Sequence, residues 1–115
     1  MTSSLTPGGI VEIDFGLPMG SEAGMVRPAI VVTAARILGG EPNVVQVVPL
    51  TRTLRVSSTE VRITPDVDNG LGAPSAAQCQ HVRSLARARV GRRLGNVGPS
   101  VLADVREVIA LLLDL

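Results

Sequence analysis

The stretch GSEAGMVRP (residues 20–28) runs directly into AIVVT (residues 29–33), so a polar loop with two glycines leads at once into an apolar segment. Five consecutive apolar or β-branched residues are typical of a buried strand. Pro28 fixes the local backbone and pushes Arg27 toward extended geometry. We therefore expect a loop that delivers one arginine to the start of a strand. From these residues alone, the guanidinium is equally well interpreted as an anion ligand or as half of an ordinary salt bridge.

Short apolar segments separated by turn residues continue on both sides of this stretch. In the predicted strand at residues 8–15, apolar and more polar positions alternate. One face carries Val11, Ile13 and Phe15, and the other carries Ile10, Glu12 and Asp14. Further strands are predicted at residues 28–33, 43–51, 58–64, 75–82 and 92–97, with one helical turn at 34–38. Because proline cannot donate to a ladder, Pro49 should lie in an edge strand or near a strand end. In the segment 58–64, Glu60 and Arg62 should share the polar face.

A helix is expected at the end of the chain. Pro99 suits the first helical position, and an apolar stripe follows it: Val101, Val105, Val108, Ile109 and Leu112. Residues 110–113 are apolar all round, so we expect that end to be buried. Short strands, glycine-rich connections and one terminal helix favour a mainly β domain spanning residues 1–115, built as a small barrel or a strongly curved sheet.

Composition narrows the possible functions. The eleven basic residues are all arginine and the net charge is only +1, so any nucleic-acid binding must come from a local cluster. A single His and a single Cys give no metal site by spacing, and Cys79 is better read as a small buried residue than as a nucleophile. No segment approaches the length of a membrane span or the pattern of a secretion signal, so a soluble cytoplasmic protein is expected.

Four motifs, in order, resemble the MazF/PemK family of toxin endoribonucleases. They are Gly-Ser-Glu with Arg-Pro at residues 20–28, Val-Val-Pro-Leu-Thr at 47–51, His-Val-Arg-Ser-Leu at 81–85, and an apolar helix after Gly-Asn-Val at 95–97. The resemblance covers nearly the whole chain. It implies an SH3-like barrel, a homodimer, a single-stranded RNA substrate, a cognate antitoxin, and no metal or cofactor.

The same resemblance assigns roles to particular residues. Arg27 and Thr51 correspond to the pair that binds the scissile phosphate, where the ribose 2′-hydroxyl attacks. Arg27 suits stabilisation of the phosphorane, whereas a guanidinium is a poor general base. Further residues are expected to contact RNA: Ser21, Glu22, Arg52, Arg55, His81 and Arg83. His81 is the candidate for proton transfer because histidine titrates near neutral pH, although a lone strand histidine is more often structural.

The arginine run leaves two interpretations open: Arg83, Arg87, Arg89, Arg92 and Arg93 either track a phosphate backbone or form a solvated face paired with acidic residues. The start of the chain departs from the family. Pro7-Gly8-Gly9 replaces a charged motif, and Val11-Glu12 lacks the aromatic residue that related chains carry, which points to altered or lost nuclease activity. The alternative is a non-catalytic protein-binding module, including a gyrase poison like CcdB, although that family depends on a C-terminal tryptophan that this chain lacks.

Overall fold

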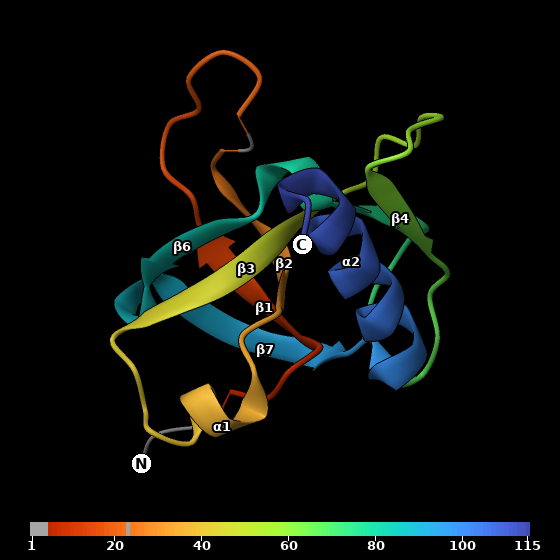
Figure 1. The fold of residues 1–115 in the computed structure, drawn as a ribbon. Helices are drawn as coiled ribbons and strands as arrows, with labels where there is room; N and C mark the ends of the chain where they lie inside the picture. The colour runs from red at the N-terminus through yellow and green to blue at the C-terminus, as the bar shows by residue number, and fades with distance from the viewer. Residues whose placement is uncertain (1–4, 23) are drawn as a thin grey trace.

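The computed structural model describes residues 5–22 and 24–115; residues 1–4 and Ala23 of the arginine-bearing loop lie outside the described part. The described chain is mainly β, as expected, and ends in a helix (Figure 1). Its strands are β1 (Gly9–Asp14), β2 (Val26–Val31), β3 (Val44–Thr51), β4 (Glu60–Ile63), β5 (Ser75–Gln78), β6 (Arg83–Ala86) and β7 (Val90–Asn96). Its helical segments are α1 (Ala35–Leu38), the 3₁₀ turns η1 (Cys79–His81) and η2 (Arg87–Arg89), and α2 (Gly98–Leu113).

All paired strands are antiparallel, in the order β4-β5-β3-β2-β1-β7, with β6 also paired to β3. Among the described residues the sheet does not close, so the barrel-like fold is a strongly curved open sheet. Strand β3 pairs with β6 through residues 44–47 and with β5 through residues 50–51. Pro49 lies between these two paired stretches, where a missing N–H costs no ladder hydrogen bond. It is therefore near a strand end, as predicted, although β3 is central in the sheet.

Both faces of the central strands are buried, which explains their long apolar runs. One face packs against α2 in a cluster of Ile10, Ile30, Val48, Leu50, Ile63, Ala77, Cys79, Val97, Leu102 and Val105. The concave face holds Val11, Ile13, Phe15, Ala29, Val31, Val45, Val47 and Leu85. The predicted apolar face of β1 is therefore confirmed, but Ile10, placed on the polar face, is also buried because α2 covers that side.

Several predicted boundaries are wrong. The expected strand at 75–82 ends at Gln78 as β5 and is followed by η1, so Cys79 and His81 belong to a 3₁₀ turn. Strand β6 begins only after this range and was not predicted. Strand β2 begins and ends two residues earlier than predicted, whereas β4 covers only the middle of its predicted range. Glu60 was expected on a polar face with Arg62, but its side chain is only 2% exposed.

The C-terminal end of α2 also differs from expectation. Leu111, Leu113 and Leu115 are 71%, 57% and 89% exposed. This apolar end is therefore not buried within the chain itself. The predicted apolar stripe does pack inward for most of its length, joined by Leu102, which the prediction omitted.

A tight turn at residues 66–70 packs its backbone against β7. The Asn69 side chain, 1% exposed, accepts hydrogen bonds from the Asp66 and Leu71 backbone N–H groups and donates one to the Thr64 carbonyl oxygen. Gly70 has φ +68°, and a Cβ there would collide with the Leu94 carbonyl group. A Cβ on Gly95 would lie 2.5 Å from the Asn69 carbonyl carbon. The turn and β7 can meet only because both positions lack a side chain.

Candidate active site

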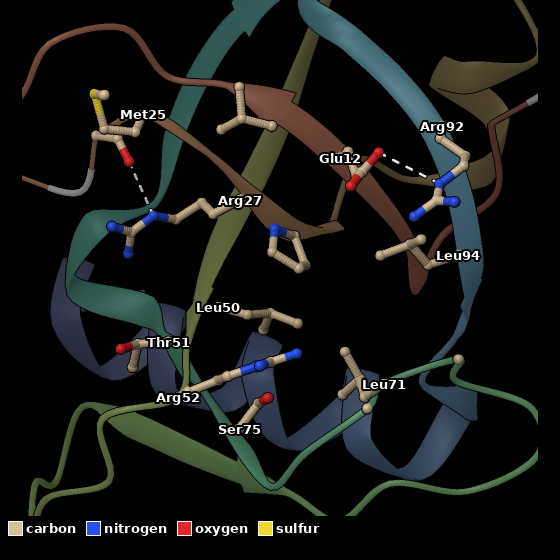
Figure 2. A pocket seen from close by; sticks show the side chains of 15 residues that line it. Glu12, Met25, Arg27, Leu50, Thr51, Arg52, Leu71, Ser75, Arg92 and Leu94 are labelled. Carbon is tan, nitrogen blue, oxygen red and sulfur yellow. Dashed lines mark hydrogen bonds and ion pairs between the residues drawn. The ribbon is translucent and has the colours of Figure 1, made fainter.

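A hollow of about 480 Å³ opens between the β1–β2 ribbon, the end of β3, the turn after residue 70 and β7 (Figure 2). Its lining includes both predicted catalytic residues, Arg27 and Thr51, together with Arg52. The remaining side chains that shape it are Glu12, Met25, Val26, Pro28, Leu50, Leu71, Ser75, Arg92 and Leu94. The fold therefore brings the arginine of the first loop and the threonine at the end of β3 to one site.

Arg27 is held in place by the loop that precedes it. Its Nε donates a hydrogen bond to the Gly24 carbonyl oxygen at 3.0 Å. A Cβ on Gly24 would lie 2.5 Å from Cδ of Pro18, so this close loop packing requires glycine. The guanidinium is half-buried, and its other nitrogens can still donate to an anion in the hollow.

A polar network behind Arg27 was not foreseen from the sequence. Arg27 Nη1 lies 3.5 Å from Oε1 of Gln78, and the Gln78 amide nitrogen lies 3.5 Å from Oε2 of Glu60. The same Glu60 oxygen accepts a 2.7 Å hydrogen bond from Gln80. Glu60 Oε1 has no hydrogen-bond partner but lies 3.9 Å from Nε of Arg55. The sequence does place two glutamines, Gln78 and Gln80, near a predicted strand that carries the carboxylate of Glu60. Only the register of β4 against β5 shows that these side chains meet.

Thr51 is half-buried at the end of β3. Its Oγ1 accepts a hydrogen bond from the Thr53 backbone N–H at 3.1 Å. The hydroxyl hydrogen remains available to donate, because a hydroxyl accepts and donates at once. Arg52, which follows it, is exposed and also lines the hollow.

The far side of the hollow carries a second charged pair. Glu12 on β1 and Arg92 on β7 face each other, with Oε1 3.4 Å from Nε. Figure 2 shows this pair on one side of the hollow and the Arg27 guanidinium on the other. The aliphatic side chains of Leu50, Leu71 and Leu94 also line the hollow.

The remaining predicted RNA contacts do not share this hollow. Glu22, His81 and Arg83 line a second one of about 460 Å³ with Gln80 and Val82. His81 and Arg83 do meet at one surface, but not as neighbours on one strand face, because His81 lies in η1. Ser21 is exposed on the β1–β2 loop, and Arg55 lies on the β3–β4 loop beside Glu60.

The arginines at residues 83–93 fit neither a phosphate-binding track nor a face paired with acidic residues as a whole. Arg92 pairs with Glu12, which fits a face matched to acidic groups. Arg89 instead donates to the Asp14 backbone carbonyl oxygen at 3.1 Å. The Arg83 guanidinium lies 5.7 Å from the centre of the Phe15 ring, a cation–π contact. The run is therefore not one continuous basic track.

Cys79 takes no part in this chemistry. Its side chain is fully buried, and burial raises the pKa of the thiol to about 11. A thiol that stays protonated at neutral pH is a poor nucleophile. Within residues 5–22 and 24–115, no three His, Cys, Asp or Glu side chains gather closely enough to bind a metal ion. No helix in the same ranges is long and apolar enough to cross a bilayer.

The fold and this site together define a small, curved β protein with a hollow that Arg27 and Thr51 both line. A guanidinium and a hydroxyl are groups that can donate hydrogen bonds to a phosphodiester. Residues 6–113 match the sequence pattern of the PemK-like, MazF-like toxins of type II toxin–antitoxin systems. The chain belongs to this family, whose members are endoribonucleases.

Individual relatives match this chain along nearly its whole length. Endoribonuclease MazF9 of Mycobacterium tuberculosis is 35% identical over 116 residues, which cover 94% of this chain and 95% of that protein. MazF of Deinococcus radiodurans superimposes with a TM-score of 0.84 at 30% identity, covering 99% of this chain and 100% of that one. A MazE-MazF structure from the same organism gives a TM-score of 0.76 at 28% identity, covering 99% of each chain. These relatives support an endoribonuclease toxin and give no support to a non-catalytic module or a gyrase poison.

Proposed function

We propose that this toxin cleaves single-stranded RNA at specific sequences, without a metal ion, through the hollow that Arg27 and Thr51 line together. The observation that carries the proposal is this shared hollow, because the two residues are 24 positions apart in the sequence and come from different strands. The whole chain, residues 1–115, acts as one domain, and the cytoplasm, where mRNA is translated, is its place of action.

The reaction follows from these groups. The 2′-oxygen of the ribose attacks the adjacent phosphorus, the bond from phosphorus to the 5′-oxygen breaks, and a 2′,3′-cyclic phosphate and a 5′-hydroxyl result. Arg27 stabilises the negative charge on the phosphorane oxygens, and the Thr51 hydroxyl donates a hydrogen bond to one of them. One proton leaves the 2′-hydroxyl and one reaches the departing 5′-oxygen. A guanidinium is a poor general base, so Arg27 suits charge stabilisation better than proton abstraction.

Product analysis tests the proposal. The purified protein, incubated with single-stranded RNA in EDTA, should release fragments that end in a 2′,3′-cyclic phosphate and begin with a 5′-hydroxyl. Activity that EDTA abolishes and that added magnesium restores would contradict it. So would fragments that carry 5′-phosphates.

The RNA path should extend from the first hollow to the second. Arg52 lies beside the scissile phosphate, and Glu22, His81 and Arg83 line the neighbouring hollow. Ser21 and Arg55 lie on the two loops that project from the sheet in Figure 1 and would contact RNA as it passes. We keep all six as RNA-binding residues, with phosphate contacts from the arginines.

His81 is the group we expect to move a proton near neutral pH. The charged groups that line its hollow are Glu22 and Arg83. If His81 takes part, single-turnover cleavage by wild type should show a pH dependence near neutrality that disappears in His81→Ala. An unchanged rate and pH profile in the variant would assign His81 a structural role and return proton transfer to Arg27, to water or to a carboxylate such as Glu22.

A homodimer would cover the exposed leucines at the end of α2. An apolar surface of this kind marks an interaction site, and self-association is its commonest use. Sedimentation at micromolar concentration should therefore give twice the chain mass. A monomer mass at that concentration would remove this part of the proposal.

A cognate antitoxin is the second protein partner. The family is defined by such pairs, and a MazE-MazF complex is known for the Deinococcus relative. We place an antitoxin segment across the loop at residues 20–26 and the adjacent hollow, where it would compete with RNA. Equal binding of the cognate segment to free and RNA-saturated toxin would rule out direct competition.

A further inference from the structure

Glu12 is an unexpected residue in a site that binds RNA. Its side chain is 37% exposed and lines the hollow on the side opposite Arg27. A carboxylate repels a phosphate, so this part of the hollow does not suit the RNA backbone. Only Oε1 faces Arg92, at 3.4 Å, and the part of the chain that the structure describes shows no hydrogen bond to Oε2.

The surroundings of Glu12 suit a nucleobase. Leu50, Leu71 and Leu94 provide aliphatic surface in the same hollow. A flat base can lie on such a surface, and the only aromatic residue, Phe15, is 4% exposed and covered by Arg83. The volume of about 480 Å³ is in the range of ordinary small-ligand sites and accommodates one nucleotide. A phosphate at Arg27 would thus place the attached nucleoside toward Glu12.

The chemistry of the carboxylate then selects among bases. An ionised Glu only accepts hydrogen bonds, so it favours a base edge that carries donors. Adenine and cytosine each present an exocyclic amino group beside an acceptor ring nitrogen, and guanine presents its amino group beside a second donor, the ring N1–H. Uracil has a single ring N–H between two carbonyl oxygens, and both oxygens would face the negative carboxylate.

We propose that Glu12 is a specificity-determining residue, which makes this hollow accept an amino-bearing base next to the scissile phosphate and discriminate against uracil. The inference rests on the proposed RNA cleavage. Arg92 holds the carboxylate through Oε1, which leaves Oε2 to accept a hydrogen bond from the amino group of the base.

The test compares the cleavage profiles of wild type and Glu12→Gln on a randomised pool of single-stranded RNA, read by sequencing the new 5′ ends. In wild type, one position adjacent to the cut should favour an amino-bearing base over uracil by at least about tenfold, the scale of one good base contact. Glutamine can both accept and donate, so Glu12→Gln should reduce that ratio to within about threefold and leave other positions unchanged. The sequences themselves show whether adenine, cytosine or guanine is preferred.

Asp14→Asn is the matched control. It removes one carboxylate charge from the same strand, outside the hollow, and asparagine can still accept the hydrogen bond from the Gly16 backbone N–H. Its profile should equal that of wild type. If Glu12→Gln cleaves too slowly for sequencing, binding of 2′-O-methyl oligonucleotides that differ at the one position gives the same comparison, since they lack the attacking hydroxyl.

Two results would overturn the inference. One is an identical profile in wild type and Glu12→Gln. The other is an equal change in cleavage for all four bases, which would mean that Glu12 acts only through its charge on the RNA backbone. Failure of wild type to cleave any RNA would instead contradict the proposed function, so the two failures are distinguishable.

Discussion

Replacing Arg27 with alanine is expected to lower the single-turnover rate of RNA cleavage at least about 100-fold, the effect of removing one group that stabilises a transition state. The reason is the fixed guanidinium, held through Nε to the Gly24 carbonyl oxygen and aimed by Gln78. Thr51→Ala should lose a similar factor, because the hydroxyl acts on the same phosphate. Single-turnover assays with excess enzyme report the chemical step directly.

Two further arginine variants make this result specific. Arg27→Lys keeps the charge but loses the planar pair of donors, so its rate should fall between those of wild type and Arg27→Ala. Arg36→Ala removes an exposed arginine from α1, outside both hollows, and should cleave at the wild-type rate. Full activity in Arg27→Ala or in Thr51→Ala would show that this hollow is not the catalytic site.

A large effect on stability is expected at Gly95. Gly95→Ala places a Cβ against the backbone of Asp68 and Asn69, and backbone atoms cannot rotate away as a side chain does. Overpacking of this kind should cost at least about 3 kcal/mol. For a domain of this size, that corresponds to a fall in Tm of roughly 10 °C or more. Thermal unfolding followed by circular dichroism measures it.

Gly39→Ala is the control for this variant. Gly39 ends α1 with φ −60°, and a Cβ there would make only ordinary contacts with the α1 carbonyl oxygens. Its Tm should stay within a few degrees of wild type, or rise slightly because alanine restricts the unfolded chain. A Tm of Gly95→Ala equal to that of Gly39→Ala would mean that the turn does not press on β7 as the structure shows.

The sequence predicted the strands and the C-terminal helix better than it predicted which surfaces they pack against. Three strands were identified from their patterns: β1 from the alternation at residues 10–15, and β2 and β3 from the apolar runs at 29–33 and 44–50. Alternation is typical of a strand buried on one face, and a continuous apolar run is typical of a strand buried on both. The break at Cys79–His81 was missed, since no glycine or proline interrupts residues 75–82 and nothing local marks a 3₁₀ turn. The exposed end of α2 was also misjudged, because all-apolar residues do not reveal whether the chain itself or another surface covers them.

For the candidate site too, the sequence predicted individual residues but not the contacts between them. Arg27 and Thr51 were singled out by motif, and the structure places both at one hollow, whereas their catalytic roles stay predictions. The Gln78–Glu60 network was not foreseen, because it depends on the register of β4 against β5. Glu12 was noticed only as a departure from the family. Its position opposite Arg27 comes from the pairing of β1 with β2 on one side and β7 on the other.

That pairing has a consequence for how the toxin is made. The walls of the hollow come from residue 12 near one end of the sequence and residues 92 and 94 near the other, joined through the β1–β7 ladder. A ribosome adds residues one by one, and such distant pairs form late in folding. Until the β7 segment has emerged, the nascent chain has only part of its RNA site. We therefore expect a chain that still lacks the β7 segment to be unable to cleave RNA through this hollow.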